Sequence, residues 1–162
     1  MKSKYILKGV FRTNKPIKER SALLYFVLSF LTFGIYHIVF MTKLSKDVNV
    51  LCEGDGKKTM KYVFVWLLNI VTLGIFGLIW KFMLANRLQA NAPRYSLKFS
   101  EGGALVLVYN LILPLIGLAI AQIVLIKNFN NLAKAYNEYN GLVDPDADKR
   151  VGFFADEEEV EA

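Results

Sequence analysis

The sequence contains little of what catalysis or cross-linking requires. Of its 162 residues, one is a cysteine and one is a histidine. Cys52 alone forms no intramolecular disulfide and no multi-cysteine metal site. His37 lies in a different segment, so the sequence offers no nucleophile paired with a base. We therefore expect no enzymatic activity, no catalytic residue, no cofactor and no metal ion.

Charged side chains are missing from three long stretches. No Asp, Glu, Lys or Arg occurs in residues 21–42, 62–80 or 102–126. Each stretch has roughly 19 to 25 residues, close to the ~20 that a helix needs to cross the hydrocarbon core of a bilayer. The first stretch has no polar stripe of the kind that a soluble core helix keeps. The pattern predicts an all-α membrane protein with about three transmembrane or partly re-entrant helical segments.

Overall composition supports the same class. Hydrophobic residues make up 54% of the chain, which is high for a soluble domain. About twenty mostly polar residues precede the first apolar stretch, so it does not resemble a cleaved signal peptide. The net charge of +6 suggests attraction to anionic lipid rather than to nucleic acid. We expect a multi-pass protein of the cell inner (plasma) membrane, with the lipid bilayer as its surroundings.

Charge divides the chain into three parts. Residues 1–20 carry seven Lys or Arg against one Glu, as cytoplasmic juxtamembrane segments do. Residues 21–142 form the expected membrane domain. Residues 143–162 are acidic and are expected to be flexible. In a model with three crossings, eleven basic residues lie on one side and nine on the other. That bias is too small to decide between three crossings and re-entrant hairpins.

The most informative pattern is an internal repeat. The segment from Leu28 to Tyr36, Leu-Ser-Phe-Leu-Thr-Phe-Gly-Ile-Tyr, is echoed forty residues later by the segment from Leu68 to Phe76, Leu-Asn-Ile-Val-Thr-Leu-Gly-Ile-Phe. Both contain Leu-x3-Thr-x-Gly-Ile-aromatic and continue in register. A weaker third copy runs through Gly117. We interpret the pattern as a duplication, although chance similarity in so apolar a sequence is the alternative.

The Thr-x-Gly motif allows two interpretations. In the first, glycine permits close helix approach or a kink, and threonine bonds back to a carbonyl in the preceding turn. In the second, the helix breaks at Gly34 and Gly74, and each window forms a re-entrant hairpin of half-helices. Several loops would then share one side of the membrane. Pro114 is expected to kink the third segment.

A short amphipathic stretch follows the first and third windows. Leu44, Val48 and Leu51 share one helical face after the first window, and an apolar set beginning at Phe129 follows the third. Such stretches suit a position at the membrane surface. They equally suit the ends of long helices.

The candidate residues for motif function and helix packing are the two Thr-x-Gly motifs, the aromatic residues that follow them and the polar residues inside apolar windows. Aromatic rings favour the depth of the headgroups, and buried amides favour bonds to neighbouring helices. The set comprises Thr32, Gly34, Tyr36, Thr72, Gly74, Phe76, Trp80, Asn69, Asn110 and Gln122.

The repeated segments resemble a bacterial membrane family, the domain of unknown function DUF4234. That family is similar in its Leu-Ser-x-x-Thr-x-Gly-Ile-Tyr-x-x-x-Trp segments, which lead into Asp-x-Asn or similar endings. Here the first ending is Asp47-Val48-Asn49. The sequence departs from the pattern at Phe40 and Asn69, and Arg87-Leu88-Gln89 replaces the second ending. The resemblance, over about residues 20 to 139, implies a bacterial membrane setting and assigns no catalytic residue.

Two functions remain open at this stage. The first is a non-enzymatic scaffold or regulatory subunit that packs with itself as a homo-oligomer or with a membrane protein partner. The second is a small oligomeric transport or permeation component lined by threonine and amide side chains.

Overall fold

The computed structural model describes residues 15–112 and 116–142. The amino-terminal part of the basic segment, Pro114 and the acidic tail 143–162 lie outside the described residues. Within the described part the chain forms helices and no strand, so the all-α class is confirmed. The helices are α1 (Ala22–Leu31), α2 (Ile35–Leu51), α3 (Tyr62–Val71), α4 (Ile75–Asn91), the short 3-10 helix η1 (Ala92–Tyr95), α5 (Gly103–Ile112) and α6 (Ile116–Tyr139).

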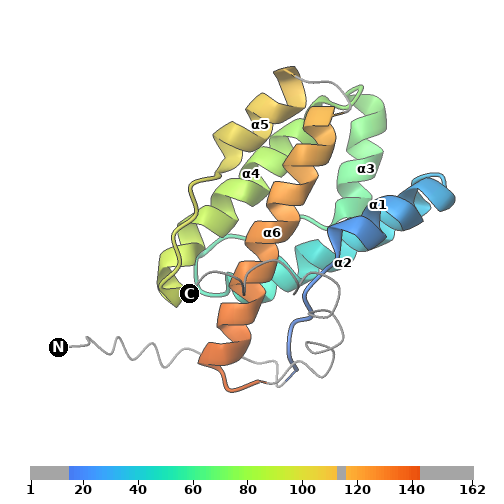
Figure 1. Ribbon diagram of the computed structural model, residues 1–162. Coiled ribbons are helices and arrows are strands. Elements are labelled where there is room, and N and C mark those ends of the chain that lie inside the picture. The colour runs from blue at the N-terminus through green and yellow to red at the C-terminus, as the bar shows by residue number, and fades with distance from the viewer. Residues whose placement is uncertain (1–14, 113–115, 143–162) are drawn as a thin grey trace, which may run out of the picture.

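The helices are arranged in pairs (Figure 1). A short helix of ten residues is followed each time by a longer one that packs beside it: α1 with α2, α3 with α4, and α5 with α6. The rings of Tyr25 and Phe40 lie 4.7 Å apart, although fifteen residues along a straight helix would separate them by roughly 22 Å. The chain therefore reverses direction inside the first apolar window.

The second window reverses in the same way. The Trp80 indole N–H donates to the carbonyl of Met60 at 3.3 Å, and the Trp80 and Tyr62 rings are 5.1 Å apart. A helix of ten residues is about 15 Å long, about half of the ~30 Å hydrocarbon core. Windows 21–42 and 62–80 are thus helical hairpins, and three straight crossings are not confirmed.

Both reversals have the same backbone geometry. The helix breaks at Gly34 (φ 87°) and Gly74 (φ 93°), each preceded by a residue with φ of 50°, Phe33 or Leu73. Glycine adopts this left-handed conformation without steric cost. The N–H of Gly34 donates to the carbonyl of Ser29 at 2.8 Å, as in a helix-terminating Schellman motif. The shared geometry confirms a helix break at each glycine, whereas re-entry into a membrane and the duplication stay predictions.

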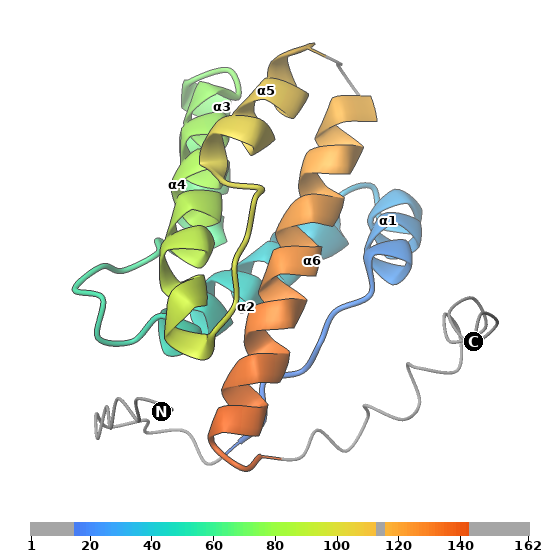
Figure 2. The same cartoon turned by 60° about the vertical axis from the view of Figure 1, so that its left-hand side comes forward.

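The core lies between the long helices. Most of the fully buried apolar side chains come from α2, α4 and α6, and α6 contacts both of the others (Figure 2). The apolar face that the sequence analysis placed on amphipathic stretches is this core: Leu44, Val48, Leu51 and Phe129 are all buried. These stretches are the continuous ends of long helices, and they bury their apolar faces against one another rather than against a membrane surface.

One helix in the described part of the chain, α6, is long and apolar enough to cross a membrane by length and composition. Half of its apolar window is buried inside the protein.

Candidate membrane-insertion surface

The turns of the first two hairpins expose large apolar side chains. Phe33 is 98% exposed and Leu73 is 92% exposed, and the large apolar residues next to them in the chain are also exposed. The facing ends of α5 and α6 add three more apolar residues. The set, which we call the apolar turns, comprises Phe30, Leu31, Phe33, Ile35, Ile70, Val71, Leu73, Ile75, Leu111, Ile112 and Ile116. Soluble proteins rarely expose so many large apolar side chains together.

The apolar turns lie away from the charged residues. The α3–α4 turn and the facing ends of α5 and α6 gather at one end of the molecule, and the α1–α2 turn projects to the side, nearer the middle of the molecule (Figures 1 and 2). The connections 52–61 and 96–102, which carry lysines and acidic residues, extend toward the other half. The second and third hairpins therefore share an apolar end, and the opposite end of the molecule is the charged end.

Each threonine of the motif joins two helices. The Thr32 hydroxyl donates to the Leu28 carbonyl at 2.7 Å and accepts from the Tyr36 N–H at 2.9 Å. Thr72 makes the same pair of bonds, to the Leu68 carbonyl at 2.8 Å and from the Phe76 N–H at 3.1 Å. One hydroxyl thus satisfies a carbonyl at the end of one helix and an N–H in the first turn of the next. The motif therefore stabilises the turn at which the chain reverses direction.

The remaining candidates are dispersed over the fold. Asn69 accepts from the N–H of Gly77 at 2.6 Å, where a Cβ on Gly77 would collide with the amide. Asn110 donates to Val106 within its own helix, and Gln122 donates to the sulfur of buried Met41 at 3.3 Å. Their side chains do not converge on a common cavity. Tyr36 and Phe76 are half-buried, on the equivalent first turns of α2 and α4.

Amide side chains on the three long helices bond the segments that precede the short helices. The Asn49 side chain on α2 bonds both the N–H and the carbonyl of Thr59, ahead of α3. Asn130 on α6 bonds both groups of Arg20, ahead of α1. Gln89 on α4 donates to the Phe99 carbonyl, ahead of α5. Each amide is the fifteenth residue of its helix. We call these residues the supporting amides.

Removal of a supporting amide is expected to lower stability measurably. In Asn130→Ala the N–H and carbonyl of Arg20, part-buried at this position, lose their partner, which costs about 2 kcal/mol. The measurement is thermal unfolding in a mild detergent, followed by circular dichroism. Asn131→Ala is the matched control, because Asn131 is the exposed neighbour on the same helix. Equal effects of the two substitutions would contradict a supporting role.

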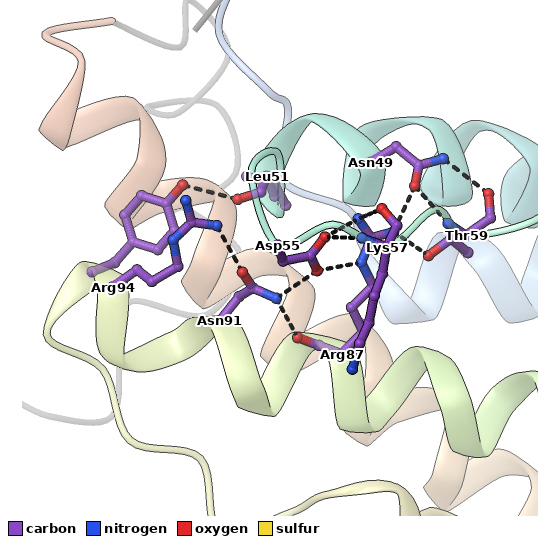
Figure 3. Close-up of polar contacts among 9 residues, drawn as sticks. Asn49, Leu51, Asp55, Lys57, Thr59, Arg87, Asn91 and Arg94 are labelled. Carbon is purple, nitrogen blue, oxygen red and sulfur yellow. Dashed lines mark hydrogen bonds and ion pairs between the residues drawn. The ribbon is translucent and has the colours of Figure 1, made fainter. Parts of the chain in front are cut away.

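Arg87 connects α4 to the loop before α3 (Figure 3). Its side chain is 6% exposed. The guanidinium donates to both Asp55 carboxylate oxygens, at 2.7 and 3.0 Å, and to the Lys57 carbonyl at 2.7 Å. It also donates to Asn49 at 2.6 Å and to the Thr59 hydroxyl at 2.7 Å. Sequence reasoning noted Arg87 only as a departure from the family pattern, because its partners lie about thirty residues away.

The Arg87 network also changes the acidity of Asp55. Burial raises the pKa of this carboxyl, but hydrogen bonds from Arg87, the Lys57 N–H and Asn91 outweigh that effect and lower its pKa to about 2. At neutral pH the carboxylate is therefore charged, and both of its oxygens accept hydrogen bonds. The arrangement pairs a buried cation with a part-buried anion, and it fixes loop geometry rather than presenting a reactive group.

The two residues with the greatest chemical reactivity are both enclosed. Burial raises the pKa of the Cys52 thiol to about 12, with Arg87 opposing the shift, and the side chain has no exposed surface. The two ring nitrogens of His37 hydrogen-bond the hydroxyls of Tyr25 and Tyr62 at 2.5 and 2.7 Å. Among the described residues, no group of three or more His, Cys, Asp or Glu could hold a metal ion.

These features describe an all-helical protein in which paired helices expose apolar turns and the supporting amides hold the segments between the pairs. Residues 20–90, which cover α1, α2, α3 and almost all of α4, match the model of the family described as "Domain of unknown function (DUF4234)". The resemblance predicted from the repeated motif is confirmed over this range. No curated protein and no solved structure matches the chain.

Proposed function

We propose that this chain is a non-enzymatic protein of the bacterial inner membrane whose helical hairpins enter the bilayer from one side. The observation that carries the proposal is the exposure of the apolar turns, with Phe33 and Leu73 almost fully uncovered. Burial of such side chains is strongly favourable in hydrocarbon. The partner of these turns is therefore the lipid bilayer.

Helix length sets the depth of insertion. α1, α3 and α5 have ten residues each, so each hairpin reaches about 15 Å, or the middle of the bilayer. Within the first two turns the threonine and glycine satisfy backbone groups, which lipid could not do. The protein then occupies mainly one leaflet. Connections 52–61 and 96–102 lie on the same side as the supporting amides.

A scaffold role fits this arrangement better than transport. A permeation path requires polar side chains that face a common space. Thr32 and Thr72 are closed into their own turns, and Gln122 is buried against Met41. The outward faces of α1 and α3 carry exposed apolar residues, including Leu23 and Phe64. These faces are suited to lateral packing against another copy or another membrane protein.

Sidedness tests the proposal directly. Single cysteines at Lys58→Cys and Ser100→Cys, in a Cys52→Ala background, place one thiol in each connection; both wild-type residues are exposed. Each variant is labelled with an impermeant maleimide in right-side-out and in inside-out membrane vesicles. The hairpin arrangement predicts that both cysteines react in the same vesicle orientation.

Three straight crossings predict the opposite result, with Lys58→Cys and Ser100→Cys reacting in opposite orientations. That outcome would overturn the proposed topology. The Cys52→Ala parent is the control for background labelling, and wild-type Cys52 itself is expected to react slowly because it is buried.

A further inference from the structure

A groove of about 750 Å³ lies between the segment 15–21 and the outer face of α2. The segment runs from beside the carboxyl-terminal end of α6, where Ile17 bonds Asn137, to the start of α1 (Figure 1). The floor is apolar and aromatic, with Leu24, Tyr36 and Phe40. We call this feature the basic groove, because lysines form its rim.

The rim carries cations on both walls. Lys15 lies on the segment wall, and Lys43 and Lys46 lie on α2. All three side chains are exposed, and none of them belongs to an ion pair among the described residues. Lys18 and Glu19 also line the groove. Deeper in the groove, Arg20 is paired with Asp47 and lies over the Phe40 ring at 5.1 Å. The unneutralised charge is therefore at the rim, and the apolar surface is below it.

A second groove provides an internal comparison. It has a similar volume, about 780 Å³, and lies between residues 57–60 and the matching face of α4. On the helix wall, Met83 and Asn86 occupy the positions that Lys43 and Lys46 occupy on α2, the ninth and twelfth residues of each helix. A cationic helix wall is thus not required by the fold. It is specific to the first hairpin.

The lysines of the rim also lie at a depth in the bilayer that suits contact with lipid phosphates. Lys43 and Lys46 are roughly 12 and 16 Å along α2 from Ile35 at the turn. If the turn reaches the middle of the bilayer, the two lysines lie near the level of lipid phosphates. Leu24 and Tyr36 then lie within the acyl-chain region.

We propose that the basic groove binds one anionic phospholipid, with the headgroup phosphate held by Lys15, Lys43 and Lys46 and an acyl chain along Leu24, Tyr36 and Phe40. The inference rests on the proposed membrane insertion, and it names the lipid class for which the site is suited. Basic pockets between membrane helices hold anionic headgroups in this way.

The test measures lipid adducts on the full chain by native mass spectrometry in a neutral detergent. The chain is titrated with phosphatidylglycerol or phosphatidylcholine of identical acyl chains. We expect one phosphatidylglycerol to bind at least tenfold more tightly than phosphatidylcholine. In Lys43→Gln/Lys46→Gln that preference is expected to fall by about thirtyfold or to disappear, since each lysine contributes about 1 kcal/mol.

Lys57→Gln/Lys58→Gln is the matched control, because it removes the same charge from the rim of the second groove. Equal loss in both double variants would overturn the proposal in favour of non-specific surface charge. Equal binding of the two lipids by wild type would also overturn it. Competition by inorganic phosphate or glycerol phosphate as strong as that by the lipid would assign the lysines to a soluble phosphate ligand instead.

The cysteine-labelling result separates this inference from the proposed function. The Lys43→Gln/Lys46→Gln changes keep the apolar turns, and in the single-cysteine variants they are expected to leave the labelling in right-side-out and inside-out membrane vesicles unchanged. Unchanged sidedness with no lipid preference in wild type refutes only the lipid site. Labelling of the two connections from opposite sides refutes the insertion geometry on which the site depends.

Discussion

A Phe33→Asn/Leu73→Asn variant is expected to bind lipid vesicles at least a hundredfold more weakly than wild type while becoming more stable in detergent. The affinity falls because Phe33 and Leu73 are the most exposed apolar residues of the turns. Burial of each side chain contributes about 1.5–3 kcal/mol, and a loss of about 3 kcal/mol already exceeds a hundredfold.

Stability rises for a separate reason. Both residues have a φ of 50°, a left-handed conformation that bulky side chains rarely adopt and asparagine tolerates. Relief of this strain at two positions is expected to contribute about 1 kcal/mol or more. The wild-type turns thus retain strained apolar residues that a soluble turn would replace. The opposite signs of the two effects distinguish insertion from a purely structural role.

The measurements are vesicle flotation for affinity and thermal unfolding in mild detergent for stability. Ser96→Asn is the matched control, because Ser96 also has a positive φ of 60° but lies at the charged end. It is expected to leave vesicle binding unchanged. Wild-type vesicle affinity in the double variant would contradict insertion through these turns.

The second large effect is expected at Arg87. Replacement by methionine leaves the part-buried Asp55 carboxylate, the Asn49 amide oxygen and the Lys57 carbonyl without this donor. Because Asp55 keeps contact with solvent, we expect a cost of about 2–3 kcal/mol, near the value for hydrogen bonds to charged groups. Arg87→Lys should retain part of the stability, because it keeps the charge but loses the two-pronged contact.

The Arg87 prediction is checked by thermal unfolding in detergent, with Lys98→Met as the control for loss of an exposed positive charge. A double-mutant cycle with Asp55→Asn isolates the pair from the other contacts. If Arg87→Met unfolds at the same temperature as Lys98→Met, the network does not stabilise the fold.

The same network makes stability depend on pH. The pKa of Asp55 is about 2 in the folded chain and 3.8 in the unfolded reference. A lowered folded pKa stabilises the protein above the unfolded value, and the contribution is lost as pH falls from about 4 toward 2. Asp55→Asn should remove this component of acid unfolding. An unchanged acid transition in that variant would assign the transition to other carboxyls.

The sequence predicted the helical class and the apolar windows, because these depend on local composition, and it offered a helix break at the glycines as one of two interpretations. Gaps between charges located the windows, and the repeated Thr-x-Gly motif placed the breaks at Gly34 and Gly74. These patterns did not decide whether each apolar window forms one straight helix that crosses the membrane or a hairpin in which the chain reverses. The outcome depends on contacts such as that between Tyr25 and Phe40, which no local pattern encodes.

The polar contacts at the charged end could not be predicted for the same reason. Asn130 bonds a residue 110 positions away, and Arg87 bonds a loop 32 positions away. In the sequence Asn130 appears only as one of several amides near the third window. The groove beside α2 also required the structure, since Lys15 and Lys43 become neighbours only when the amino-terminal segment lies along that helix.

The supporting amides give the domain a circular order. α2 holds the segment ahead of α3, α4 holds the segment ahead of α5, and α6 holds the segment ahead of α1. Because the last hairpin fastens the first, no hairpin is at an end of the series and none can detach without releasing a neighbour. The domain is therefore expected to unfold in one cooperative transition rather than hairpin by hairpin.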